Sequence, residues 1–284
     1  MRTWFITGAS RGFGALIAAR ALAAGDAVVA TARDPSAMPA SLREHANLLA
    51  VPLDVTDEAQ AHGAVAAALK RFGRIDILVN NAGYGLIGAI EESSASEVER
   101  IFATNVFGLL NVTRAVLPTM RAQRSGRVLN FSSIGGYASA MGFGIYCSTK
   151  FAVEGISEAM SLELEPLGVY ATVIEPGYFR TTFLSDSSVV STMTRIDDYA
   201  ATVGKVRDFA RGADGQQPGD PARLAEAVMA LVDAVPPPRR LPLGADTVER
   251  IERKHREVEA ELAPWRELAL STGFVQPTGS TTEP

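Results

Sequence analysis

The chain has only one cysteine, Cys147, and only three histidines among 284 residues. A single cysteine excludes an internal disulfide and a zinc site built on cysteines. The histidines, His45, His62 and His255, stand far apart in the sequence and show none of the spacing of metal ligands. We therefore expect no metal site in this protein.

Long apolar runs and a basic charge balance are also missing. No stretch approaches the roughly 20 apolar residues of a membrane span, and the first residues lack the charged segment, apolar stretch and cleavage site of a signal peptide. The 27 lysines and arginines against 32 acidic residues leave a net charge of −5, which argues against nucleic acid as the main partner. We expect a cytoplasmic protein that binds neither membrane nor nucleic acid.

The composition, with 47% hydrophobic and 21% charged residues, is that of an ordinary globular chain and excludes a long disordered protein. Single cores stop growing at about 250–300 residues, so one domain over 1–284 is expected. Within it we expect a core at 1–180, a Ser-, Thr- and Gly-rich lid or binding loop at 181–218, helices and a last strand at 219–275, and a disordered tail at 276–284.

Short apolar runs alternate with longer helical stretches through the first two-thirds of the chain. The predicted strands are Trp4–Thr7, Ala27–Ala32, Leu48–Val51, Ile75–Val79, Val128–Phe131 and Val169–Ile174, with a last short one at Leu241–Leu243. The first predicted helix begins near Gly12 and stops at Gly25. The others cover Asp57–Phe72, Glu97–Met120, Tyr146–Leu164, Asp220–Val235 and Asp246–Leu262. Pro118 should break or bend the helix at Glu97–Met120. The alternation indicates an α/β fold with a parallel sheet covered on both faces.

A glycine-rich turn, Thr7-Gly8-Ala9-Ser10-Arg11-Gly12-Phe13-Gly14, follows the first predicted strand and opens the first helix. Glycines at such a turn let the backbone turn tightly and approach a pyrophosphate closely. The N-terminus of the following helix offers free N–H groups and a positive dipole to phosphate. The turn therefore favours dinucleotide binding over a purely structural role.

The T-G-x-x-x-G-x-G spacing of this turn resembles that of the short-chain dehydrogenase/reductase family. Further similar motifs follow in order: Asn80-Asn81-Ala82-Gly83 after the fourth strand, Asn105 in Thr104-Asn105-Val106, Ser133 placed 13 residues before Tyr146, Tyr146-x-x-x-Lys150, and Pro176-Gly177 with Thr181. The resemblance spans roughly residues 2–182 and implies a Rossmann-type doubly wound parallel sheet of about seven strands with a C-terminal helical extension. VVATARDP, NNAGYG, YCSTKFAVEG and RLPLGAD look like the 17β-hydroxysteroid-dehydrogenase-like branch.

Tyr146 and Lys150 lie four residues apart on a predicted helix and so share one face. We expect the ammonium to lower the pKa of the phenol, helped by an oxidised nicotinamide, so that Tyr146 serves as general acid or base. Ser133 would hold the substrate oxygen, with Ser132 as the second choice. The resemblance also implies that Lys150 binds the nicotinamide ribose and that Asn105 orders a helix bend and a water beside Lys150.

The second strand ends Ala30-Thr31-Ala32-Arg33, with no acidic residue to accept from an adenosine ribose. Arg33 and Arg11 can instead bind a 2′-phosphate, which favours NADP(H) over NAD(H). Asp34 is the complication, and we interpret it as a turn residue because Pro35 follows. We expect the coenzyme to contact Gly8, Ser10, Arg11, Gly12, Phe13, Gly14, Arg33, Asp54, Val55, Asn81, Ala82, Gly83, Tyr146, Lys150, Pro176, Gly177, Phe179 and Thr181.

The expected substrate pocket is apolar and aromatic, and it is built from Tyr137, Met141, Phe143, Tyr178 and Phe183. Such a pocket suits a small hydrophobic ketone, aldehyde or alcohol. Two alternatives stay open: a non-catalytic NADP-sensing protein that retains the fold, and an epimerase or dehydratase of the extended branch, whose glycine spacing differs. The resemblance also implies a homo-oligomer, a dimer or tetramer paired through the two long helices. The charged C-terminal helix is either a surface helix or a partner interface.

Overall fold

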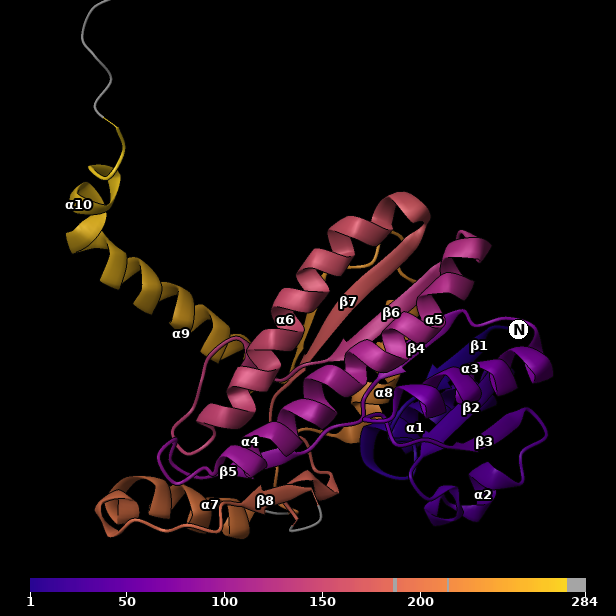
Figure 1. Ribbon diagram of the computed structural model, residues 1–284, viewed down its shortest axis with the longest axis horizontal. Helices are drawn as coiled ribbons and strands as arrows, with labels where there is room; N and C mark the ends of the chain where they lie inside the picture. Colours follow the sequence, from indigo (N-terminus) through magenta and orange to yellow (C-terminus); the bar gives the residue numbers. More distant parts are fainter. Residues whose placement is uncertain (186–187, 214, 275–284) are drawn as a thin grey trace, which may run out of the picture.

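The computed structural model describes residues 1–185, 188–213 and 215–274, and shows a parallel sheet between two layers of helices (Figure 1). The expected tail, 276–284, lies outside these residues. The strand order is β3-β2-β1-β4-β6-β7-β9. The strands are β1 (Thr3–Ile6), β2 (Ala27–Ala32), β3 (Leu48–Pro52), β4 (Ile77–Asn80), β6 (Gly126–Phe131), β7 (Val169–Pro176) and β9 (Arg240–Leu243). The predicted doubly wound α/β fold is confirmed.

Alternate side chains of each central strand enter the two cores. Trp4 and Ile6 of β1 pack with helices α1 (Gly12–Ala23) and α8 (Pro221–Asp233) on one face. Phe5 points to the other face, where it packs with α3 (Glu58–Phe72), α5 (Leu109–Gln123) and α6 (Gly144–Leu164). Because both faces are buried, the central strands are mostly apolar, as parallel strands in such folds are.

The helix predicted at Glu97–Met120 is a longer, composite element. It consists of α4 (Ala95–Phe102), a π-helical segment Ala103–Gly108 and α5, which runs on past Pro118. Pro118 is exposed, so water can satisfy the carbonyl that the proline leaves without a donor. Over the whole run, 95–123, an 18-residue window is apolar enough to cross a membrane, but 56% of it is buried within the protein, as in the core helix of a globular domain.

The segment predicted as a lid or loop, 181–218, contains regular elements instead. Strand β8 (Val189–Ser191) pairs with β5 (Gly85–Ile87), and helix α7 (Lys205–Ala213) follows. Arg207 of α7 forms a buried ion pair with Glu92. Burial by itself would raise the pKa of Glu92, but the N–H groups of Ala89 and Ile196 and the Arg207 guanidinium hold that pKa at about 2. Tertiary contacts of this kind leave little local pattern in a sequence.

The long helix α9 (Ala245–Leu262) and the short helix α10 (Arg266–Leu270) complete the described C-terminal part. The short helix α2 (Ala40–Arg43) lies near β3. Figure 1 shows α9 and α10 extending away from the sheet. Every residue from Glu252 to Phe274 is exposed except Lys254, which is half-buried.

Candidate active site

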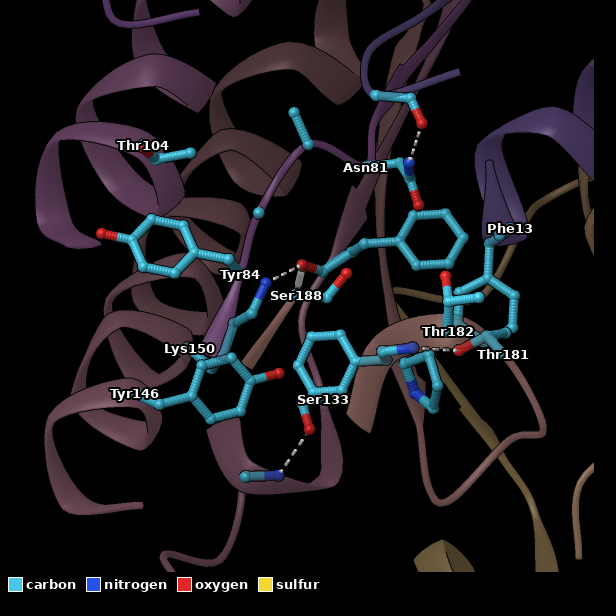
Figure 2. Close-up of a pocket in the computed structure, with 18 of the residues that line it drawn as sticks. Phe13, Asn81, Tyr84, Thr104, Ser133, Tyr146, Lys150, Thr181, Thr182 and Ser188 are labelled. Carbon is cyan, nitrogen blue, oxygen red and sulfur yellow. Dashed lines mark hydrogen bonds between the residues drawn. The ribbon is translucent and has the colours of Figure 1, made fainter. Parts of the chain in front are cut away.

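A cavity of about 900 Å³ lies where β1, β4, β6 and β7 end. Its lining includes a residue one or two positions after each of these strands, namely Gly8, Asn81, Ser132 and Gly177. The sheet order changes direction between β1 and β4, and ligands of doubly wound sheets bind in the crevice at this point. Figure 2 shows the side chains that converge there.

The glycine turn has the shape that the sequence predicts. Gly8 and Gly12 adopt positive φ angles of 65° and 56°, which favour glycine. A Cβ on Gly14 would lie 2.5 Å from the carbonyl oxygen of Gly8, so the backbone could not close with a larger residue. The Asn81 amide donates to the carbonyls of Thr7 (2.9 Å) and Gly8 (3.1 Å) and fixes the turn.

Helix α1 begins at the end of this turn, and no side chain caps its N-terminus. The N–H groups of its first turn are therefore available to an anion, and their dipole favours a phosphate. This cradle fits the pyrophosphate of a dinucleotide, because its walls are backbone and glycine. Ser10, Phe13, Asn81, Ala82 and Gly83 line the same part of the cavity.

Beyond β2 the lining contains Ala32, Arg33 and Asp34. The Asp34 carboxylate accepts hydrogen bonds from the N–H (2.9 Å) and hydroxyl (2.6 Å) of Ser36, as expected of a turn residue. Arg11 donates to the hydroxyl of Ser188, 3.0 Å away. Asp54 and Val55, expected to contact adenine, also line the cavity.

Ser133, Tyr146 and Lys150 meet at the other end of the cavity (Figure 2). Tyr146 and Lys150 lie one turn apart on α6, both buried, and the ammonium nitrogen is 5.8 Å from the centre of the phenol ring. Lys150 Nζ donates to the carbonyl of Phe131, 2.8 Å away. Ser133 Oγ accepts from the N–H of Gly135 at 3.0 Å. The three residues can present two hydroxyl groups and a cation to one substrate atom.

Burial dominates the acid–base properties of this group. It raises the pKa of the Tyr146 phenol, although a hydrogen bond with Ser133 acts in the opposite direction. Burial also lowers the pKa of Lys150 to about 8, against the raising effect of the Glu154 carboxylate. The expected lowering of the phenol pKa by Lys150 is therefore not seen in the protein alone: desolvation of the phenolate raises that pKa, and the opposing contact is the hydrogen bond with Ser133.

Asn105 lies in the π-helical segment and is buried. Its side-chain oxygen accepts from the N–H of Tyr84 (3.0 Å), and its nitrogen donates to the carbonyl of Tyr84 (2.9 Å) and to Thr149 (3.1 Å). A π-helical turn is rare and often marks a functional site. The structure thus places Asn105 at an irregularity of the helix and joins it to α6 one residue from Lys150.

The aromatic pocket forms only in part as expected. Phe143 and Phe183 pack on the Tyr146 ring, with ring centres 6.1 and 5.8 Å away, and Tyr178 also lines the cavity. Tyr137 and Met141 are not among its lining residues.

These two residues lie elsewhere because their loop leans on other elements. Tyr137 hydrogen-bonds His255 of α9 through its hydroxyl. Met141 is 61% exposed and lines a separate, smaller hollow on α7. Gly142 turns the loop there with a positive φ of 76° and packs on Val206. The loop path is set by α7, which the sequence pattern did not predict.

The remaining expected coenzyme residues, Pro176, Gly177, Phe179 and Thr181, all line the cavity. The cavity is also lined by residues that the sequence did not predict, among them Tyr84, Thr104, Ser188, Gln217 and Arg250. Tyr84 directly follows the Asn80–Gly83 motif and could have been included on that signal. The last three come from segments without a motif, and only the fold brings them to the cavity.

Comparisons with known proteins agree with this geometry. The family profile described as short chain dehydrogenase matches residues 2–189. Oxidoreductase BOA17 of Botryotinia fuckeliana is 37% identical over 273 residues, which cover 95% of this chain and 99% of that protein. The 3-ketodihydrosphingosine reductase of Bacteroides thetaiotaomicron is 37% identical over 240 residues, covering 84% and 86%.

Solved structures of similar proteins have the same fold. A short-chain dehydrogenase from Streptomyces avermitilis superposes with a TM-score of 0.90 at 40% identity, covering 96% of this chain and 99% of that chain. Two more distant structures hold different coenzymes. A Brucella melitensis 3-ketoacyl-(acyl-carrier-protein) reductase with NADH is 27% identical, with a TM-score of 0.71, and the match covers 85% of this chain and 96% of that chain. A serine dehydrogenase with NADP⁺ is 28% identical, with a TM-score of 0.72, and the match covers 85% of this chain and 94% of that chain. The chain is a member of the short-chain dehydrogenase/reductase family of oxidoreductases.

Proposed function

We propose that this protein is an NADP(H)-dependent oxidoreductase that interconverts a hydrophobic ketone or aldehyde and its alcohol. The observation that carries the proposal is the meeting of Ser133, Tyr146 and Lys150 at one end of a cavity whose other end is the glycine turn. A sensor of the coenzyme would need the glycine turn but not a buried phenol beside a hydroxyl and a lysine.

The residues divide the work by their chemistry. Ser133 donates a hydrogen bond to the substrate oxygen and positions it beside the phenol. Tyr146 transfers its proton to that oxygen during reduction and takes it back during oxidation. A bound reduced nicotinamide supplies the hydride that this proton accompanies. Burial raises the pKa of the phenol, so in the protein without coenzyme Tyr146 is the proton donor to a carbonyl oxygen.

The NADP(H) preference rests on the end of β2. Ala32 offers no carboxylate to an adenosine ribose, and Oδ1 of Asp34 accepts two hydrogen bonds from Ser36, as in a turn. Arg33 lines the cavity on the same side and supplies a cation for a 2′-phosphate.

The substrate proposed here is hydrophobic, because Phe143, Phe183 and Tyr178 surround the reactive end of the cavity. One relative is named as a reductase of a keto compound, which supports the ketone class. That the protein belongs to the 17β-hydroxysteroid-dehydrogenase-like branch of the family stays a prediction from short sequence motifs. We further propose a homo-oligomer that works in the cytoplasm.

The test is oxidation of NADPH with a panel of hydrophobic ketones and aldehydes, followed by absorbance. The native enzyme should turn over at least one of them, and Tyr146→Phe should lower kcat by roughly 10²–10⁴-fold, because general acid catalysis contributes about that factor. Binding of NADPH by the variant serves as the control for folding. Undiminished turnover by Tyr146→Phe contradicts the mechanism, and tight NADPH binding without turnover of any carbonyl or alcohol favours the sensor.

A further inference from the structure

Gln217 is a buried residue whose side chain has no hydrogen-bond partner among the described residues. It is 3% exposed, lies in the segment after α7 and lines the cavity. Neither its Oε1 nor its Nε2 is paired. An unpaired buried polar group costs about 1–3 kcal/mol, and folded proteins rarely keep two on one side chain. A donor and an acceptor facing a ligand cavity therefore indicate a ligand that offers both.

The backbone of this segment is fixed against the turn that follows β7. The carbonyl of Gln217 accepts a hydrogen bond from Arg180 Nε at 3.2 Å. Two residues later Gly219 forms a parallel bridge with Phe179, and its carbonyl accepts from the N–H of Arg180 at 2.8 Å. A Cβ on Gly219 would lie 2.7 Å from the Phe179 ring, so the two segments are in direct contact.

This contact places Gln217 on the coenzyme side of the cavity. Phe179 packs edge-on against Phe13 of the glycine turn, with ring centres 5.6 Å apart. Thr181, two residues after Phe179, belongs to the predicted nicotinamide-contacting motif. Gln217 thus stands beside the chain segment that joins the phosphate end of the cavity to its reactive end.

The side-chain amide of Gln217 limits which chemical groups of a ligand can pair with both of its polar atoms. A phosphate or a substrate carbonyl offers acceptors only and would leave Oε1 unpaired, and a hydroxyl offers its donor and its acceptor on one atom, whereas Gln217 presents them on two. A carboxamide offers one acceptor and two donors and satisfies both Gln217 atoms at once. We propose that Gln217 pairs with the carboxamide of the nicotinamide ring, its Nε2–H donating to the carboxamide oxygen and its Oε1 accepting from the carboxamide nitrogen. This inference rests on the proposed function, and it adds a residue that orients the ring for hydride transfer.

The test compares binding of NADP⁺ with binding of its 3-acetylpyridine analogue, in which a methyl group replaces the carboxamide NH₂. Dissociation constants are measured by calorimetry, without turnover. The native protein should bind the analogue roughly tenfold more weakly, because Oε1 then loses its donor. Gln217→Met should bind NADP⁺ roughly tenfold or more weakly and should no longer distinguish the two coenzymes.

The neighbouring Gln216 is exposed, so Gln216→Met is the matched control and should behave as the native protein. A fragment without the ring, 2′-phospho-ADP-ribose, should bind the native protein and Gln217→Met equally. Equal binding of NADP⁺ and its analogue by the native protein would overturn the inference without any variant. Discrimination that persists in Gln217→Met overturns it too and points to a ribose hydroxyl or to another residue. If the native protein binds neither NADP⁺ nor NAD⁺, the proposed function itself fails.

Discussion

Burial shifts the pKa values of the two central residues, Tyr146 and Lys150, in opposite directions. The family resemblance identified both residues, and their four-residue spacing predicted that they share one face of a helix. It could not predict that desolvation would raise the pKa of the phenol and lower that of Lys150 to about 8. Those shifts depend on how much protein surrounds each group, which the local sequence does not record.

Arg33 is the residue on which coenzyme choice should depend. Replacing it by alanine removes a charge-assisted contact to a 2′-phosphate worth about 1.5–3 kcal/mol, so Arg33→Ala should lose roughly 10–100-fold in kcat/KM with NADPH and little with NADH. Arg43→Ala is the matched control, because Arg43 on α2 carries the same charge but is not among the lining residues. Equal kcat/KM of the native enzyme for the two coenzymes contradicts the assignment.

Among the helices and strands, those with clear start and stop signals in the sequence lie where they were predicted, and those without such signals do not. The capped helix α3 matches its prediction, with Asp57 accepting from Gln60 at its start and Gly73 in the left-handed conformation at its end. Helix α4–α5 was less predictable, because its π-helical segment depends on the contacts of Asn105 with Tyr84 and Thr149. Helix α7 and strand β8 had no pattern strong enough to indicate them.

Strand β7 and helix α6 also share a buried carboxyl pair, Glu175 and Glu154, beside Arg240. Burial, and then the negative charge of Glu154, raise the pKa of Glu175 to about 8, against the lowering effect of Arg240. A carboxyl whose pKa is higher in the folded than in the unfolded state makes the protein less stable as pH rises between the two values. The native protein should therefore lose stability from this group between about pH 5 and 8.

Glu175→Gln removes this titration, so relative to the native protein the variant should gain about 1 kcal/mol or more in the free energy of unfolding between pH 5 and 8. Urea denaturation at the two pH values measures the difference. Glu158→Gln is the control: Glu158 also pairs with Arg240, but that contact lowers its pKa, so it stays ionised across the range. A pH-independent difference between Glu175→Gln and the native protein would refute the assignment.

At the scale of the whole molecule, the C-terminal arm formed by α9 and α10 stands out from the body (Figure 1). It exposes Val258, Leu262, Trp265 and Leu268, at three- and four-residue spacing along one side. A helix in isolation is marginal in water, and exposed apolar side chains at this spacing are typical of a contact surface. We propose that the arm takes part in the homo-oligomer.

The double substitution Leu262→Glu with Trp265→Glu should therefore reduce the solution mass toward the 30.1 kDa of one chain, while the native protein runs at two or four times that mass. Light scattering coupled to size exclusion measures this. Glu261→Gln, a neighbouring change at an exposed position, should leave the mass unchanged. A native protein of single-chain mass would refute the oligomer, and an unchanged mass of the double variant would exclude the arm from its interface.

The amino-acid sequence by itself determined the strands of the main sheet, most of the long helices, the glycine turn and the positions of Ser133, Tyr146 and Lys150. These features depend on local periodicity and on spacings within a turn or a helix, which are read along the chain. Only the tertiary structure decided that Gln217 and Ser188 line the cavity, that Tyr137 and Met141 do not, and that burial governs the pKa values of the reactive residues. These outcomes depend on contacts between segments far apart in the sequence and on the exclusion of water by the assembled layers.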